Sequence, residues 1–224
     1  MEKVFLTFLA IMLITIGSIA SKNGIEGKLR SDMLVGKDTI LNFDNETIGI
    51  SPSGFLQTAT GVSKDMKWMV VKDAQNKVVA QQAINEGSCY NMLVFDKLNY
   101  LDFAASVKIK AVSGVEDQGG GLVWRYTDNK NYYIARYNPI ENNLRFYRVV
   151  NGSREQLVSV ISNIRQGEWF SLAIEMKGNK ITCSLNGLKL IETSDDTFKS
   201  AGQIGFWTKA DAITYFDDLN IVSK

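Results

Sequence analysis

The chain has 224 residues, 45% of them hydrophobic, so it can bury a substantial core within the size range of a single all-β domain. Its 25 Lys and Arg residues balance 24 Asp and Glu residues, which excludes a strong overall field for attracting nucleic acid or an anionic membrane. The sequence contains no histidine, which excludes His-based catalytic triads and His-ligated zinc sites. Because the charges balance, we expect no nucleic-acid partner.

The first 20 residues predict a cleaved signal peptide. Lys3 supplies a positive charge, residues 4–16 are apolar, and Ser18-Ile19-Ala20 supplies the small residues of a cleavage site. The alternative is a retained membrane anchor, because about 20 apolar residues can span a bilayer. We favour export, with the protein secreted or periplasmic and free of the membrane after cleavage.

Residues 21–37 are polar and predict a leader or an extra strand, and residues 38–224 predict the main domain. From Asp38 onward, short β-like segments recur at the spacing of about 8–12 residues that is typical of a sandwich or barrel. No segment of similar length has a helical period. The fold class is therefore all-β. The expected strands are 39–43, 54–60, 67–73, 77–83, 90–96, 102–110, 119–127, 131–138, 143–150, 154–161, 168–176, 179–185, 187–192, 202–208 and 213–222.

Turn residues in the middle of the chain allow side chains to be assigned to the two faces of one sheet. Turns at Asn129-Lys130, at residues 138–143 and at Asn151-Gly152 set the register, and successive side chains alternate between faces. This register places Trp124 opposite Ala135 and Tyr137 opposite Leu144. The expected core face carries Leu122, Trp124, Tyr126, Tyr133, Ala135, Tyr137, Leu144, Phe146 and Leu157, with an Arg148/Glu155 pair near its margin. The opposite face carries Val123, Arg125, Thr127, Tyr132, Ile134, Arg136, Arg145, Tyr147 and Val149.

The second face places three arginines on adjacent strands: Arg125, Arg136 and Arg145. Like charges repel there unless solvent, internal carboxylates or a ligand screen them. One interpretation is a surface that binds an acidic or polyhydroxylated ligand, and the other is a solvated face whose arginines pair with Asp or Glu. Tyr132 and Tyr147 favour the first, because flat amphipathic rings stack on sugars.

The sequence offers few catalytic or metal-binding patterns. Carboxylates are paired at Glu116-Asp117, Asp195-Asp196 and Asp217-Asp218, and Glu175 lies on an expected strand, but no strand carries a Glu-x-Asp-x-x-Glu cluster. The two aspartates at 217–218 should point to opposite faces. A calcium site in a loop such as 116–118 has no supporting motif, so we expect no cofactor and no metal.

A glycine run and two cysteines carry further local predictions. Gly119-Gly-Gly121 precedes a strand and lacks the Lys-Ser/Thr of a phosphate loop, so it predicts a bulge or a close backbone approach. Cys89 and Cys183 could form one disulfide after export, although Cys183 fits a buried free thiol equally well.

Several motifs together give a resemblance from about Asp38 to Lys224. They resemble the concanavalin A-like jelly-roll domains of bacterial exported proteins, most closely the family named for 3-keto-disaccharide hydrolase and more distantly the laminin-G-like modules. The motifs are Gly119-Gly-Gly-Leu-Val-Trp-Arg125, Asn131-Tyr-Tyr-Ile-Ala-Arg136, Gly167-Glu-Trp169, Leu185-Asn-Gly187, Gly205-Phe-Trp-Thr-Lys-Ala-Asp211 and Tyr215-Phe-Asp-Asp-Leu219.

The resemblance implies two antiparallel sheets packed face to face, one of them concave and often bound to carbohydrate. Arg125 matches the arginine that ends the family's Gly-Leu/Ile-x-x-Arg strand, and residues 207–211 match its late motif near a loop. Glycosidases of this fold carry a carboxylate cluster that is missing here, so no catalytic residue is assigned.

Three hypotheses follow. The first is an exported carbohydrate-binding protein, the second is a hydrolase of 3-keto or ordinary glycosides that uses loop carboxylates, and the third is a structural or adhesive module whose arginines are paired internally. The expected ligand-binding residues of the first are Arg125, Tyr132, Arg136, Arg145 and Tyr147, with Trp207 and Lys209 near the rim.

Overall fold

The computed structural model describes residues 36–224, and this part of the chain is all-β. The predicted signal peptide, and all of the predicted leader except Gly36 and Lys37, lie outside the described residues. The strands are β1 (Thr39–Leu41), β2 (Phe55–Thr60), β3 (Trp68–Asp73), β4 (Asn76–Gln81), β5 (Tyr90–Tyr100), β6 (Phe103–Ser113), β7 (Gly120–Asp128), β8 (Asn131–Asn138), β9 (Asn143–Val150), β10 (Ser153–Ile161), β11 (Trp169–Lys177), β12 (Lys180–Leu185), β13 (Leu188–Ser194), β14 (Gly202–Lys209) and β15 (Ile213–Ser223).

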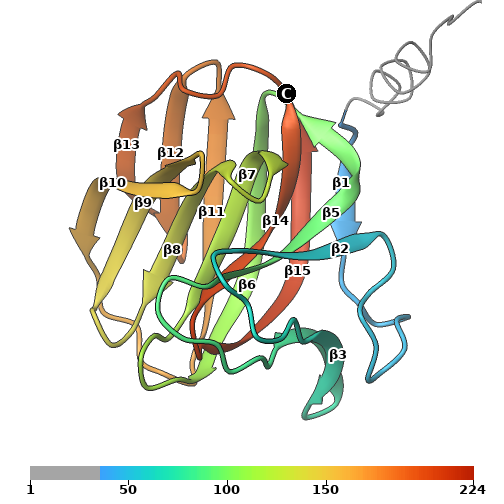
Figure 1. Cartoon of the computed structure of the whole chain (residues 1–224). Coiled ribbons are helices and arrows are strands. Elements are labelled where there is room, and N and C mark those ends of the chain that lie inside the picture. Colours follow the sequence, from blue (N-terminus) through green and yellow to red (C-terminus); the bar gives the residue numbers. More distant parts are fainter. Residues whose placement is uncertain (1–35) are drawn as a thin grey trace, which may run out of the picture. The chain divides into compact units, whose positions relative to one another are not determined.

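The strands form two antiparallel sheets that lie face to face as a sandwich (Figure 1). The front sheet has seven strands in the order β10-β9-β8-β7-β14-β5-β2. The back sheet has eight, in the order β13-β12-β11-β6-β15-β4-β3, with β1 paired to β15. Every expected strand is present, which confirms the all-β two-sheet fold.

A single large aromatic and aliphatic core fills the space between the sheets. It includes Trp68, Trp124 and Phe206, all at most 1% exposed. Phe206 of β14 stacks on Phe216 of β15 with ring centroids 4.7 Å apart, so the two layers touch at their centre. Burial of side chains of this size is the main favourable term in the stability of the sandwich.

The predicted register of the front sheet is confirmed between β8 and β9 and wrong between β7 and β8. Tyr137 pairs with Leu144 as expected. Between β7 and β8, Trp124 pairs with Tyr133 instead of Ala135, because the register shifts between Trp124 and Asp128. A β-bulge of this kind adds a residue to one strand, so the alternation of faces breaks there.

On β10, the Arg148/Glu155 pair predicted at the margin of the core face is present, with Arg148 Nη2 2.8 Å from Glu155 Oε2. Leu157 lies in a register shift, so Val158 and not Leu157 is the partner of Phe146, and the Leu157 side chain packs against the core.

The two cysteines do not form a disulfide, and both are buried as free thiols. Cys183 is part of the core, where burial raises its pKa to about 12, so it remains a neutral apolar group at ordinary pH. In the described part of the chain, no helix is long and apolar enough to span a membrane.

Candidate functional site on the front sheet

The outer face of the front sheet carries its own hydrophobic cluster, separate from the core. Its members are Tyr90, Met92, Val94, Val123, Tyr126, Tyr132, Ile134, Val149 and Trp207. Side chains on the outer face of a flat sheet would be open to solvent, whereas these are buried. The sheet must therefore be strongly rolled, so that its outer face encloses side chains of its own.

Two contacts across this face demonstrate the rolling. The Thr60 hydroxyl at the end of β2 lies 2.5 Å from the Tyr132 hydroxyl on β8, although three strands separate β2 from β8 in the sheet order. The same Thr60 hydroxyl donates to the Asn129 carbonyl, so Tyr132 must be the donor in the first contact. In Figure 1, β2 runs across the direction of the other strands of its sheet.

The arginines at the margin of this face are paired by one carboxylate. Arg136 and Arg145 are register partners on β8 and β9, as predicted. Glu141 from the intervening turn reaches both, with Oε2 2.6 Å from Arg136 Nη2 and 2.9 Å from Arg145 Nη1. Burial alone would raise the pKa of Glu141, but the two guanidiniums outweigh it and hold the pKa below its usual value.

A second carboxyl group lies at the same end of the sheet and has the opposite shift. Asp117 is buried; its Oδ1 accepts from Asn138 at 3.1 Å, and its Oδ2 lies 3.3 Å from Lys209 Nζ. Burial raises the pKa of Asp117, and the positive charges of Lys209 and Arg136 offset this only in part. The environment thus favours the protonated form of Asp117 and the ionised form of Glu141, a combination that marks candidates for acid–base chemistry.

The predicted aromatic residues do lie on this face, but their rings are covered. Tyr132 is 0%, Trp207 1% and Tyr147 3% exposed. They therefore do not form an open stacking platform in this structure. Their rings support the groups above them.

The group that lies over the Tyr147 and Trp207 rings is Arg154 of β10, a residue that the sequence reasoning missed. Its guanidinium carbon lies 4.6 Å from the ring centroids of both Tyr90 and Tyr147 and 5.8 Å from that of Trp207. Arg154 is half-buried, and among residues 36–224 its guanidinium has no hydrogen-bond or ion-pair partner. A signal was present, because the predicted register opposes Arg154 to Val149 and so places it on this face.

Arg125 does not lie with the other predicted residues, which corrects the sequence prediction. The bulge in β7 puts Tyr126 on the outer face beside Tyr132, with ring centroids 5.9 Å apart. Arg125 is 1% exposed, and its Nη1 donates to the Ser200 carbonyl at 2.7 Å. The structure thus brings six of the seven predicted residues together and separates Arg125 from them.

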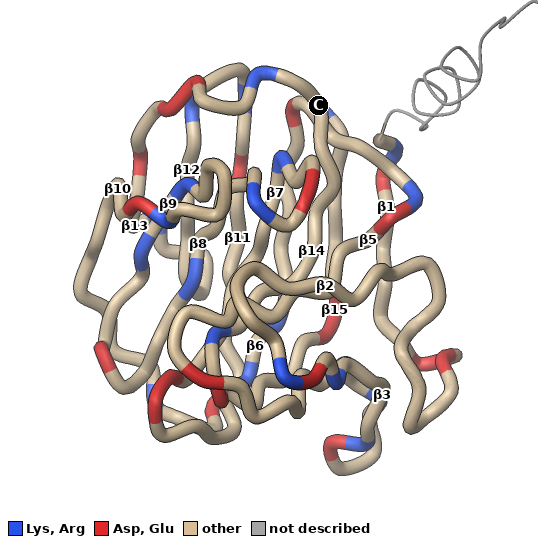
Figure 2. The backbone as a smooth tube through the Cα atoms, in the orientation of Figure 1, with Lys and Arg blue, Asp and Glu red and all other residues tan. Residues whose placement is uncertain are grey.

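The other carboxylate pairs have ordinary structural partners. Asp217 is buried and accepts from Asn76, whereas the neighbouring Asp218 is half-exposed and pairs with Lys108. Phe216 and Leu219 on either side both lie in the core, and the register shifts between Asp217 and Asn220, so the two aspartates do not point to opposite faces, which corrects the sequence prediction. Asp195 accepts from Tyr133 and pairs with Arg148. Acidic and basic residues alternate over both sheets, without a block of one sign (Figure 2).

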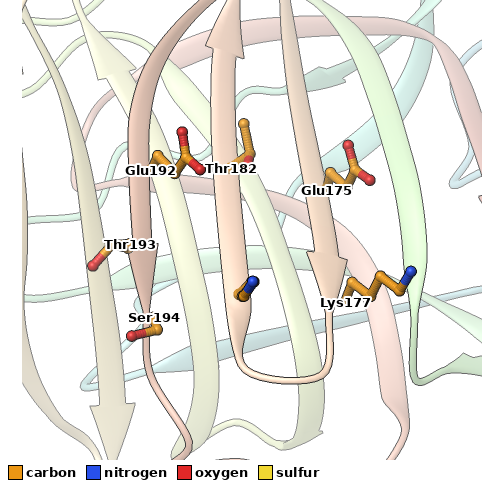
Figure 3. A pocket seen from close by; sticks show the side chains of 7 residues that line it. Glu175, Lys177, Thr182, Glu192, Thr193 and Ser194 are labelled. Carbon is orange, nitrogen blue, oxygen red and sulfur yellow. The ribbon is translucent and has the colours of Figure 1, made fainter.

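Glu175 lines a hollow of about 490 Å³ on the outer face of the back sheet, far from the residues above in the strand order. Glu175, Thr182 and Glu192 stand in a row across β11, β12 and β13 (Figure 3). Each glutamate has a lysine partner, Lys224 for Glu175 and Lys189 for Glu192. The hollow has no aromatic wall, and its charges are solvated, so the front sheet is the better candidate site.

Among residues 36–224, no group of three or more Cys, Asp or Glu side chains is arranged to hold a metal ion. The loop at 116–118 instead receives the Asp211 carboxylate, which accepts from the backbone amides of Val115, Glu116 and Asp117.

The fold is shared with many solved structures. A carbohydrate-binding module, CBM66 from Bacillus subtilis, superposes with a TM-score of 0.62 at 20% identity, over 75% of this chain and 95% of that one. Bacillus licheniformis beta-glucanase superposes with a TM-score of 0.61 at 12% identity, over 85% of this chain and 100% of that one. A Bacteroides ovatus mixed-linkage glucan GH16 protein superposes with a TM-score of 0.59 at 11% identity, over 82% of this chain and 99% of that one.

Sequence comparison is more specific. No curated protein matches the chain significantly. A family model described as the 3-keto-alpha-glucoside-1,2-lyase-like domain matches residues 53–222, which is most of the chain and spans β2 to β15. The protein belongs to the 3-keto-alpha-glucoside-1,2-lyase-like domain family.

Proposed function

We propose that the protein binds carbohydrate on the outer face of the front sheet, with Arg154 as the central hydrogen-bond donor. The observation that carries this proposal is the packing of the Arg154 guanidinium on Tyr90 and Tyr147, which fixes its plane while leaving its N–H groups without a protein acceptor among the described residues. A guanidinium has five donors in a rigid fork, a geometry suited to the oxygens of sugars. Solved structures of the same fold include carbohydrate-binding proteins, which supports the ligand class.

The neighbouring residues would complete the binding surface. Arg145 and Lys209 have side chains that are 28% and 19% exposed, so both can reach a ligand. Glu141 accepts hydrogen bonds from two arginines and keeps a partly exposed carboxylate for sugar hydroxyls. Tyr132, Tyr147 and Trp207 would support this layer from beneath.

The test is glycan binding by the full chain, measured by calorimetry on a panel of neutral and uronic-acid-containing oligosaccharides. Replacing Arg154 with alanine removes several charge-assisted hydrogen bonds, so we expect binding to weaken by about 30-fold or more. Arg154→Lys keeps the charge but loses the planar fork and should be intermediate. Arg165→Ala, in an exposed loop outside the face, is the matched control and should bind as the parent does.

Unchanged glycan affinity in Arg154→Ala would reject this surface. Loss of affinity in Arg165→Ala as well would point to non-specific charge attraction. Melting temperatures of both variants, measured alongside, separate loss of binding from loss of fold.

Catalysis on the same face is a second candidate, supported by the opposite pKa shifts of Asp117 and Glu141 and by the family to which the chain belongs. In a 1,2-elimination from a 3-keto-glucoside, a base removes the proton on C2, next to the C3 carbonyl. That electron pair forms the C1–C2 double bond, the C1–O bond breaks, and the leaving oxygen takes a proton. Glu141 would be the base and Asp117 the acid, with Arg136 beside the developing negative charge.

We expect the full chain to release the aglycone from a 3-keto-alpha-glucoside, and Asp117→Asn and Glu141→Gln each to lower the rate by about 100-fold or more. Glu116→Gln, next to Asp117 but largely exposed, should keep the parent rate. The measurement is chromatographic detection of the released aglycone. No release by the parent, or equal rates in all variants, would reject catalysis by these residues and leave carbohydrate binding as the only proposed function.

Export is part of the proposal and rests on residues 1–20, which lie outside the described residues. A secreted or periplasmic protein would meet glycans there. The main domain begins by Thr39, since β1 pairs with β15, while Gly36 and Lys37 of the predicted leader precede it without regular structure.

A further inference from the structure

A second hollow lies at one end of the sandwich, away from the outer face of the front sheet. It has a volume of about 290 Å³ and is lined by Arg125 and by three connections between strands. These are residues 101–102 between β5 and β6, residues 178–179 between β11 and β12, and residues within 195–199 between β13 and β14. The last connection runs over the top of the sandwich in Figure 1.

Arg125 reaches this hollow because of its backbone. It has a φ of +50°, which is uncommon for a residue other than glycine and costs free energy. Gly202 on β14 makes room for the bulge, since a Cβ there would lie 2.5 Å from the Arg125 carbonyl carbon. The chain thus holds a strained bulge whose effect is to turn Arg125 away from the outer face.

The Arg125 guanidinium is buried with donors left over. Nη1 donates to the Ser200 carbonyl, but Nε is buried and has no hydrogen-bond partner among the described residues. Nη2 is 3.9 Å from Asp102 Oδ1, which is too far for a hydrogen bond. A buried donor without an acceptor is costly, so a ligand oxygen in the hollow that Arg125 lines would stabilise this guanidinium.

One wall of the hollow is held in place by internal hydrogen bonds. Tyr133 donates to the Asp195 carboxylate at 2.5 Å and accepts from the Phe198 amide at 3.2 Å. Burial, together with the hydrogen bond to Asp195, raises the pKa of Tyr133 to about 12, so this donor stays protonated at ordinary pH. Arg148 also pairs with Asp195. A wall fixed in this way costs little ordering free energy when a ligand binds.

The charges around the hollow select the class of ligand. Asp102, Asp195 and Asp196 would repel an anion, and Arg125 with Lys199 would repel a cation. A neutral hydroxyl group both donates and accepts, so neighbouring hydroxyls can satisfy Arg125 and the aspartates together. Phe198 and Leu101 add apolar walls, and the volume is at the lower end of the roughly 300–1,000 Å³ range of ligand pockets.

We propose that this hollow binds one neutral sugar ring, as a free monosaccharide or as the end of a glycan, with Arg125 and Asp102 as its main polar contacts. The site is distinct from the outer face of the front sheet and needs no contribution from Arg154. The protein would then have two separate sugar-binding sites, one on the outer face of the front sheet and one in this hollow.

The test is a titration of the ¹⁵N-labelled full chain with glucose, galactose and their methyl glycosides, with glucuronate and glucosamine as charged analogues. We expect neutral sugars to shift the amide signals of Gly178, Asn179 and Phe198, and both charged analogues to bind about tenfold more weakly. Asp102→Asn should weaken neutral-sugar binding by a similar factor while preserving the acceptor for the Gly178 amide. Asp196→Ala removes one carboxylate from the lining of the hollow, at an exposed position where the change does not endanger the fold.

Arg154→Ala should leave these shifts unchanged, and Lys189→Ala, an exposed variant on β13, should also have no effect. A negative result for glycan binding at Arg154 would therefore not affect the amide shifts expected for the hollow, and absence of these shifts would not affect the proposal for the outer face. Absence of shifts at the three amides with every neutral sugar, tighter binding of glucuronate or glucosamine, or equal affinity in Asp102→Asn would overturn the proposal.

Discussion

Gly121→Ala is expected to destabilise the protein by at least about 3 kcal/mol, because the added methyl group has no space. A Cβ on Gly121 would lie 1.9 Å from the Ala135 carbonyl oxygen and 2.7 Å from the Arg136 Cα on the neighbouring strand. Both atoms belong to the backbone of β8, so relief requires β7 and β8 to separate. The loss should appear as a lower urea midpoint followed by tryptophan fluorescence.

Gly167→Ala is the matched control. Gly167 has a φ of +79°, and a methyl group added there would have no heavy atom within 4 Å, so only the backbone conformation opposes alanine. A cost of about 1 kcal/mol is expected. A Gly121→Ala loss no larger than that of Gly167→Ala would show that the strands part easily and that the close approach is not a requirement.

Glu141→Ala is expected to cost about 2 kcal/mol of unfolding free energy at neutral pH. The substitution leaves the buried Arg136 without its carboxylate and leaves Arg136 and Arg145 as unscreened register partners. Breaking a fully buried pair costs roughly 3–5 kcal/mol, and the smaller figure reflects a Glu141 side chain that is 38% exposed. Glu141→Gln, which keeps an acceptor oxygen, should lie between the variant and the parent.

The same pair has a defined pH dependence. The pKa of Glu141 is below its usual value of 4.5 in the folded protein, so its contribution is fully present above the pKa of the unfolded chain. It is lost as the pH falls through the lower pKa of the folded state. The difference in stability between the parent and Glu141→Ala should therefore be constant near neutral pH and shrink below about pH 4.5.

Glu155→Ala provides the comparison for this prediction. Glu155 pairs with Arg148 at 2.8 Å on neighbouring strands, but its side chain is 58% exposed. An exposed pair contributes at most about 1 kcal/mol. Equal losses in the two variants, or a gap for Glu141→Ala that persists in acid, would contradict the assignment of Glu141 as the carboxylate that neutralises the buried arginine.

The strands and most of the core could be predicted because alternation and turn residues act locally. Trp124, Tyr133 and Phe146 were expected on one face, and all three lie in the core. The glycine run at 119–121 was expected to allow a bulge or a close backbone approach, and a Cβ on Gly119 or Gly121 would lie 2.1 or 1.9 Å from a carbonyl oxygen of β8. These features depend on neighbours in sequence or on one adjacent strand, which is the range over which a period of two residues is informative.

The candidate site could be predicted only in part, because it depends on two long-range features. One is the bulge at Arg125, where a single positive φ reverses the faces of Arg125 and Tyr126. The other is the roll of the front sheet, which brings Arg154 of β10 against Tyr90 of β5. No local pattern encodes either, since both arise from the packing of the whole sheet.

The hydrogen bonds of Thr60 and Ala59 also affect how this sheet meets other protein chains. Strand β2 is an edge strand, and edges with free carbonyl and amide groups can recruit strands from other molecules. The Ala59 carbonyl accepts from the Asn129 side chain, and Thr60 bonds to the turn that contains Asn129. This end of the edge strand β2 is therefore occupied by the protein's own turn, which protects the protein against self-association through β-strand addition.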